Sequence, residues 1–168
     1  AQDRFIAAWG QMGSAWGISR TMAEVHALLY ITGRDLCTDD VIERLHISRG
    51  NASMSLRALQ DWGVISRVHK RGDRKEYFTA ESDVLTMCRT IARERKKREI
   101  DPVIASLYEI RDMTGPGAPV EGGETVARHN ERLDEMLKFL ETIDAISREL
   151  RDAGGRGRGR RRGRGRRR

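Results

Sequence analysis

The chain has 168 residues and a formal net charge of +7, from 32 Lys and Arg against 25 Asp and Glu. This length allows one hydrophobic core with an extension and excludes a large multidomain enzyme. No apolar run approaches the ~20 residues that a membrane-spanning helix needs, and the first residues lack the pattern of an export signal. We therefore expect a cytoplasmic protein with no membrane partner.

Positive charge is concentrated at the C-terminal end. Residues 154–168 consist of nine Arg and six Gly, and residues 1–153 alone carry a net charge of −2. A segment of Arg and Gly cannot bury a core, so we predict that this tail is disordered. Its guanidinium groups are expected to attract nucleic acid without regard to sequence. A tail that only tunes solubility is the alternative interpretation.

The first predicted elements are two amphipathic helices. A helix over residues 3–16 is indicated by large apolar residues at the spacing of one helix face. These residues are Phe5, Trp9, Met12 and Trp16. A second helix is predicted over residues 20–32. Ser19 stands where a capping residue is expected, and Gly33 stands where a helix commonly ends in a left-handed conformation.

Two short helices joined by a short connection are predicted next. Thr38 is expected to cap the first, whose sequence is TDDVIERL, and Ser48 is expected to cap the second, over residues 48–62. On the second helix, apolar residues fall on one side and small or polar residues on the opposite side. This pattern is typical of a helix-turn-helix, with residues 48–62 as the recognition helix.

A β-hairpin is predicted directly after the recognition helix. Residues 64–70 alternate in polarity and are rich in β-branched side chains, and residues 74–79 can pair with them around the Gly72–Asp73 turn. Such a hairpin, over residues 64–79 in all, is the wing of a winged helix. Residues 44–75 hold eight cationic side chains against two aspartates, a net charge of +6. We therefore predict that this region meets DNA.

The remaining chain is predicted to be helical. An apolar stripe begins near residue 83 and continues past Asp101-Pro102, where the helix is expected to kink or restart. Residues 114–123, rich in Gly and Pro, interrupt it. Over residues 124–152, apolar positions repeat every seven residues, which favours packing against another helix, plausibly that of a second subunit.

Residues 24–78 resemble the MarR-type winged-helix regulators, and in particular their GbsR-like branch. Two segments carry the resemblance: SRGNASMSLRALQDWG at Ser48–Gly63 and GDRKEYF at Gly72–Phe78. It implies a homodimeric transcription regulator whose N- and C-terminal helices form the dimer. It also implies that some members bind a small effector, here of unknown identity. Aromatic side chains that could line such a pocket are Trp9, Trp16, Tyr30 and Tyr108.

The predicted fold is mainly α with a small β-hairpin. It comprises an N-terminal dimerisation helix (1–18), a winged helix-turn-helix DNA-binding domain (19–82), C-terminal dimerisation helices (83–153) and the disordered Arg/Gly-rich tail (154–168). We expect a homodimer that binds double-stranded DNA, with the recognition helix in the major groove and the wing on the backbone or in the minor groove.

The predicted DNA contacts follow from their positions on the recognition helix and wing. Three residues near the start of the helix are expected to reach base edges: Arg49, Asn51 and Ser55. Three more are better placed for phosphates: Ser48, Ser53 and Arg57. The wing is expected to contribute Lys70, Arg71 and Arg74.

No cofactor, metal or catalytic group is predicted. The four histidines are scattered, and the two cysteines match no zinc spacing. The acidic neighbours of Cys37 disfavour a redox role. The sequence shows no catalytic triad pattern or phosphate-binding loop, so we do not expect an enzyme. The alternative function is an architectural or RNA-associated nucleic-acid-binding protein in which the Arg/Gly tail dominates binding.

Overall fold

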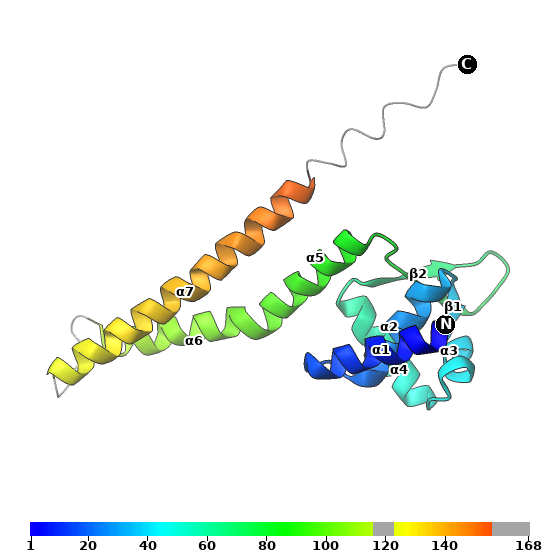
Figure 1. Ribbon diagram of the computed structural model, residues 1–168, viewed down its shortest axis with the longest axis horizontal. Helices are drawn as coiled ribbons and strands as arrows, with labels where there is room; N and C mark the ends of the chain where they lie inside the picture. Colours follow the sequence, from blue (N-terminus) through cyan, green and yellow to red (C-terminus); the bar gives the residue numbers. More distant parts are fainter. Residues whose placement is uncertain (116–122, 156–168) are drawn as a thin grey trace, which may run out of the picture. The chain divides into compact units, whose positions relative to one another are not determined.

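The computed structural model describes residues 1–115 and 123–155 of the chain (Figure 1). These residues form two compact units. The first runs from Ala1 to Ile91, and the second begins at Ala92.

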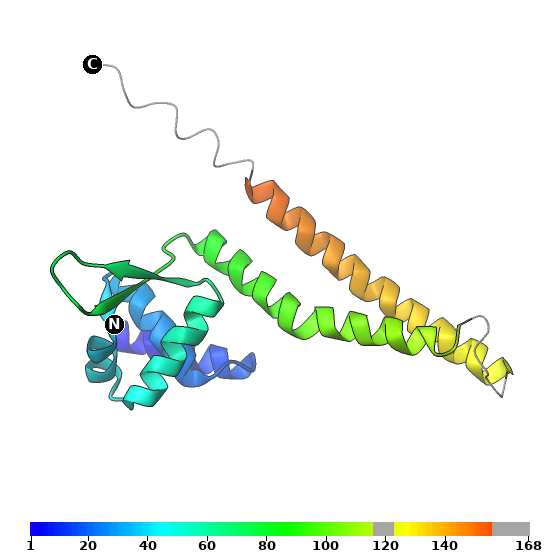
Figure 2. The ribbon, with the colours of Figure 1, turned by 180° about the vertical axis from the view of Figure 1, so that it is seen from behind.

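Four helices and a three-stranded sheet make up most of the first unit (Figures 1 and 2). The helices are α1 (Gln2–Ala15), α2 (Arg20–Thr32), α3 (Thr38–Leu45) and α4 (Arg49–Asp61). The strands are β1 (Leu36–Cys37), β2 (Ile65–His69) and β3 (Glu76–Ala80), and they pair antiparallel in the order β1-β3-β2. The predicted wing is present as β2 and β3, and β1 adds a third strand that the sequence analysis did not predict.

Helix α1 contacts α2 most closely through small residues beside the predicted apolar stripe. Its buried residues are Ile6, Gly10 and Gly13, whereas Trp16 is 55% exposed. At Gly13, an added Cβ atom would stand 2.5 Å from the Cβ of Ala23 in α2. The two helices therefore approach each other along glycines. In the predicted apolar stripe, Phe5 and Trp9 are half-buried and pack against the core, and only Trp16 at its end is exposed.

The ends of α2 and α4 are those that the sequence predicts. The hydroxyl of Ser19 accepts the backbone N–H of Met22 at 3.5 Å, and Gly33 adopts a left-handed conformation with φ +58°. The hydroxyl of Ser48 accepts the backbone N–H of Asn51 at 3.2 Å. Local capping chemistry thus sets where the recognition helix begins.

Helix α3 begins one residue earlier than predicted, at Thr38. Cys37, in an extended conformation, is the capping residue, and Thr38 is already helical. The Asp40 carboxylate accepts the backbone N–H of Cys37 at 2.8 Å. Because Cys37 also pairs with Tyr77 of β3, the sheet and the helix start are built on the same residue.

The core of the first unit lies between α2, α3, α4 and the sheet. The side chains excluded almost completely from solvent are Val25, Leu28, Leu29, Val41, Leu56 and Val64. Phe78 of β3, at 4% exposure, packs against them. Because the inner face of α4 packs in this core, the opposite face of α4 points outward. The core also holds the wing next to α4.

The second unit is an antiparallel helical hairpin. Its elements are the last turn of α5 (Val84–Arg95), a π-helical turn η1 (Lys96–Ile100), α6 (Asp101–Asp112) and α7 (Gly123–Gly155). Helices α6 and α7 run side by side in both views (Figures 1 and 2). The Arg111 guanidinium joins them by donating to the Asp134 carboxylate at 2.8 Å.

At Asp101-Pro102 the helix restarts after a widened turn. Pro102 has no backbone N–H to continue the regular hydrogen-bond ladder, and η1 immediately precedes it. The Lys96 ammonium in that turn lies 2.5 Å from the Asp101 carboxylate and 2.9 Å from that of Asp144 in α7. Salt bridges therefore hold the irregular turn against the neighbouring helix.

The predicted disordered tail lies almost entirely outside the described residues. Its first two residues, Gly154 and Gly155, are the last of α7.

Candidate nucleic-acid interface

The outward face of the N-terminal half of α4 is free for contact. Arg49, Gly50, Asn51, Ser53 and Met54 are all exposed, and Met54 retains 67% of its accessible surface. An added Cβ atom at Gly50 would meet only the Ser48 hydroxyl oxygen, at 3.9 Å. The backbone at the start of the helix can thus be approached closely by a bound partner.

The other residues predicted on α4 fall on different faces. Arg57 is exposed, as a phosphate contact requires. Ser55 is 7% exposed and lies on the inner side with Ala52 and Leu56. We therefore leave Ser55 out of the candidate interface.

The wing cations that are predicted to contact DNA lie on a six-residue loop between β2 and β3. Lys70, Arg71 and Arg74 are exposed there, and Gly72 has φ +85°, a backbone conformation that other residues rarely adopt. The loop projects beyond the strands in both ribbon views (Figures 1 and 2). This geometry presents the guanidinium groups of the loop to a partner.

Asp73 organises the wing loop from within. Its carboxylate accepts the backbone N–H of Lys75 at 2.9 Å and the hydroxyl of Tyr77 at 2.7 Å. The first contact is the main reason that the pKa of Asp73 is lowered. The hydrogen bond to Asp73 raises the pKa of Tyr77 to about 12, and Asp73 thus ties the loop to β3.

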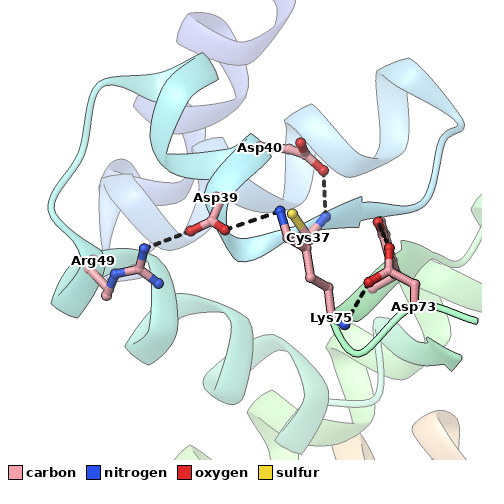
Figure 3. A network of polar contacts seen from close by, with 7 residues as sticks. Cys37, Asp39, Asp40, Arg49, Asp73 and Lys75 are labelled. Atoms are coloured by element: carbon pink, nitrogen blue, oxygen red, sulfur yellow. Dashed lines mark hydrogen bonds and ion pairs between the residues drawn. The ribbon is translucent and has the colours of Figure 1, made fainter. Parts of the chain in front are cut away.

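A single carboxylate joins the recognition helix to the wing. The Arg49 guanidinium donates to one oxygen of Asp39, in the first turn of α3, at 2.6 Å. The Lys75 ammonium lies 3.4 Å from the other oxygen. Figure 3 shows the Asp39 carboxylate between these two cations. Arg49 is the main cause of a lowered Asp39 pKa, and Asp39 is the main cause of a raised Lys75 pKa.

The remaining candidate cations differ in how they are held. Lys70 lies 4.0 Å from the Asp35 carboxylate, with its ammonium 3.9 Å from the centre of the Tyr77 ring. Within residues 1–115 and 123–155, Arg57, Arg71 and Arg74 form no ion pair. The charges of these three arginines are therefore available to phosphates.

The structure brings together residues that the sequence analysis treated separately. In the sequence, Asp39 is only one of the acidic neighbours of Cys37, and Lys75 only contributes to the net charge of residues 44–75. Their contact depends on the path of β1 and α3 beside the wing, which no local pattern encodes. Asp39 stands ten positions before Arg49, and this spacing alone does not predict that the two side chains meet.

Other kinds of site are not indicated by the residues that the structure describes. They contain no group of three or more His, Cys, Asp or Glu side chains that could hold a metal ion. None of their helices is long and apolar enough to cross a membrane.

A helix-turn-helix followed by a β-hairpin on a small antiparallel sheet is the winged-helix fold, with α4 as its second helix and β2–β3 as its wing. A solved structure described as a transcriptional regulator has the same fold. It superposes with a TM-score of 0.63 at 22% identity, covering 95% of this chain and 99% of that chain. The predicted fold class is confirmed.

Two curated proteins of Bacillus subtilis (strain 168) are similar in sequence. The HTH-type transcriptional repressor GbsR is 25% identical over 109 residues, which are 65% of this chain and 60% of GbsR. The putative HTH-type transcriptional regulator YvaV is 24% identical over 83 residues, 49% of this chain and 47% of YvaV. The matches thus span about half to three-fifths of these relatives, and no family model matches the chain. The predicted resemblance to GbsR-like regulators is confirmed by these similarities.

Proposed function

We propose that this protein is a sequence-specific DNA-binding transcription regulator that acts as a homodimer. The fold supports this proposal, as do the names of its relatives, which are those of regulators and not of enzymes. In the proposed complex, α4 of each subunit enters a major groove, and the two grooves lie about one helical turn, ~34 Å, apart.

The proposal rests chiefly on the contact of Arg49 and Lys75 with one carboxylate. Because Asp39 touches both, the start of α4 and the wing loop must lie on the same side of the unit. The side chains proposed to read bases and the cations of the wing loop therefore lie near each other. A surface of this kind can meet a groove and its flanking phosphates together.

Two exposed side chains near the start of α4 are assigned to base readout. A guanidinium such as that of Arg49 matches the acceptors of guanine, and an amide such as that of Asn51 matches adenine. Ser48, Ser53 and Arg57 are assigned to phosphates. The wing residues are assigned to the backbone or the minor groove: Lys70, Arg71 and Arg74.

Selection of bound sequences from random duplex DNA tests the proposal directly. We expect a pseudo-palindromic preferred site with two half-sites about one helical turn apart. Recovery of no preferred sequence by the purified full chain would reject the proposed function.

Asn51→Ala tests the assigned base contact. The substitution should weaken binding to the selected site by about 1–3 kcal/mol and relax preference at one base pair of each half-site. Affinity for random duplex should stay nearly unchanged, because the amide carries no charge. Gln60→Ala, farther along the same helix and half-buried, is the control, and it should leave base preference as it is.

The second unit supports the proposed homodimer. On α7, Met136, Phe139 and Ile146 are 50%, 60% and 54% exposed, and Met113 at the end of α6 is 73% exposed. A helical hairpin that leaves this much apolar surface uncovered is suited to pack against a second copy.

Effector response is proposed from the resemblance alone. Of the predicted aromatic residues, Trp9 and Tyr30 pack around His26 in the first unit, and no pocket is assigned.

The alternative function is an architectural or RNA-associated protein that binds nucleic acid through its Arg/Gly tail. Nine arginines in the last fifteen residues favour it. Deleting residues 154–168 separates the two functions. If the winged helix recognises the sequence, the truncated chain should keep its sequence preference. The slope of log affinity against log salt concentration should become shallower by about 0.9 for each lost phosphate contact. If preference and affinity disappear together in filter binding, the alternative is favoured.

A further inference from the structure

Asp39 lies at the proposed DNA-binding surface, where a negative charge should weaken binding to DNA. Its side chain is about half exposed at the same surface as the cations of α4 and the wing. A carboxylate facing a phosphate backbone costs binding energy at any DNA sequence. Its presence therefore calls for a benefit other than affinity.

The geometry of the Arg49 contact offers such a benefit. Asp39 uses one oxygen to accept a single N–H of Arg49, at 2.6 Å between Oδ1 and Nη2. A guanidinium has five N–H donors in a fixed plane, so the other four remain for a partner. One fixed donor restricts the rotation of the long side chain before DNA arrives, which reduces the entropy lost when it pairs with a base.

The second oxygen of Asp39 extends this restraint to the wing. Lys75 lies 3.4 Å from Oδ2, at the end of the loop that Asp73 shapes. The same carboxylate therefore sets the position of Arg49 relative to the wing. Arg57, Arg71 and Arg74, which are assigned to phosphates, have no such restraint within the described part of the chain. A phosphate contact tolerates a mobile cation, whereas bidentate base recognition requires a defined plane.

We propose that Asp39 is a positioning residue for DNA sequence discrimination. It holds the Arg49 guanidinium in the orientation that reads a base, and it restrains Lys75 at the wing. It also keeps both cations from neutralising phosphates on DNA of the wrong sequence. The proposal rests on the proposed function, because it needs a preferred DNA sequence to discriminate.

The test compares Asp39→Asn with Glu43→Gln in the full chain. Both substitutions remove one negative charge from α3, and Glu43 is exposed without contacting Arg49 or Lys75. The probes are the duplex that the wild type selects from random DNA and duplexes that differ from it by one base pair. Fluorescence anisotropy over a range of salt concentrations gives both the affinity and the salt slope.

Asp39→Asn should reduce discrimination at one base pair of the half-site by at least about fivefold, the lower end of what a bidentate base contact supplies. On random duplex, the salt dependence should become steeper by about 1 to 2 in slope, because Arg49 and Lys75 become free to neutralise phosphates. Glu43→Gln should raise affinity for every duplex by the same factor and leave discrimination and slope unchanged.

A second comparison shows whether Asp39 acts through Arg49. In an Arg49→Ala background, Asp39→Asn should cause no further loss of discrimination at that base pair. Additive losses, or identical behaviour of Asp39→Asn and Glu43→Gln, would overturn the proposal. A wild-type chain that selects no sequence would reject the proposed function instead, so the two failures are distinguishable.

Discussion

At the scale of single residues, His26 shows how a polar side chain is made part of a core. It is 3% exposed, and its ring lies between Trp9 and Tyr30, with centroids 6.1 and 6.4 Å away. Its Nε2 atom has no hydrogen-bond partner among the described residues. Burial disfavours the charged imidazolium and lowers the pKa of His26 to about 4.

Acid should therefore destabilise the first unit through His26. Above pH 6.5, the ordinary pKa, the ring is neutral in both the folded and the unfolded chain, and its contribution to stability is fully present. As the pH falls from 6.5 to about 4, only the unfolded chain takes up the proton, so stability declines by roughly 3 kcal/mol. Urea unfolding followed by tryptophan fluorescence at pH 7 and pH 4.5 measures the loss.

His26→Phe, which keeps an aromatic ring but cannot titrate, should flatten this pH dependence. Val41→Ala is the matched control, because it lowers stability from a fully buried position without removing a titratable group. It should keep the wild-type slope with pH. If His26→Phe retains the full acid dependence, the assignment to His26 is wrong.

Single residues also show where local patterns suffice. Ser48 caps α4 as predicted because the choice depends only on its hydroxyl and the next three backbone N–H groups. The cap of α3 is Cys37 and not Thr38, because pairing with β3 places Cys37 in an extended conformation. The inward turn of Ser55 likewise depends on which side of α4 the core covers.

At the scale of elements, the contact between α1 and α2 depends on a residue without a side chain. A methyl group at Gly13 would come within 2.5 Å of the Ala23 Cβ atom, so the helices would have to move apart. Gly13→Ala should destabilise the first unit by about 1–3 kcal/mol, despite the higher helix propensity of Ala. The midpoint of chemical unfolding measures the effect.

Gly10→Ala on the same helix is the matched control. Its new methyl group would meet the side chain of Glu24, which can change rotamer, whereas the Ala23 Cβ atom is fixed to the backbone of α2. Its cost should be clearly smaller than that of Gly13→Ala. Equal costs would indicate that the helix contact does not depend on close approach at Gly13.

The sheet is an element that local patterns predict only in part. Alternation and a turn between residues 64 and 79 predict β2 and β3. Strand β1 has two residues, too few to show any periodicity. It forms because Leu36 and Cys37 pair with the edge of β3 that β2 does not occupy. Its consequence is functional, since it brings the start of α3, with Asp39, beside the wing.

At the scale of the whole molecule, the exposed apolar face of α7 predicts how copies associate. Phe139→Glu should shift the chain from dimer to monomer, because a charge would be buried at the proposed contact. Light scattering coupled to gel filtration measures the mass. Because Phe139 is 60% exposed within the unit, the substitution should leave the helical content unchanged.

Lys138→Glu is the control for this prediction, because it adds negative charge at the neighbouring exposed position without removing apolar surface. It should remain dimeric. A dimeric Phe139→Glu protein, or a monomeric wild type, would contradict the proposed role of this face.

Helix positions, most helix ends, the wing hairpin and the basic region could be predicted from the chain alone, because each depends on residues close together in sequence. The close approach of α1 to α2 at Gly13, the cap of α3, the third strand and the Asp39 contact were decided by packing. Each requires segments far apart in sequence to meet, and which segments meet depends on the total surface buried and not on any local pattern.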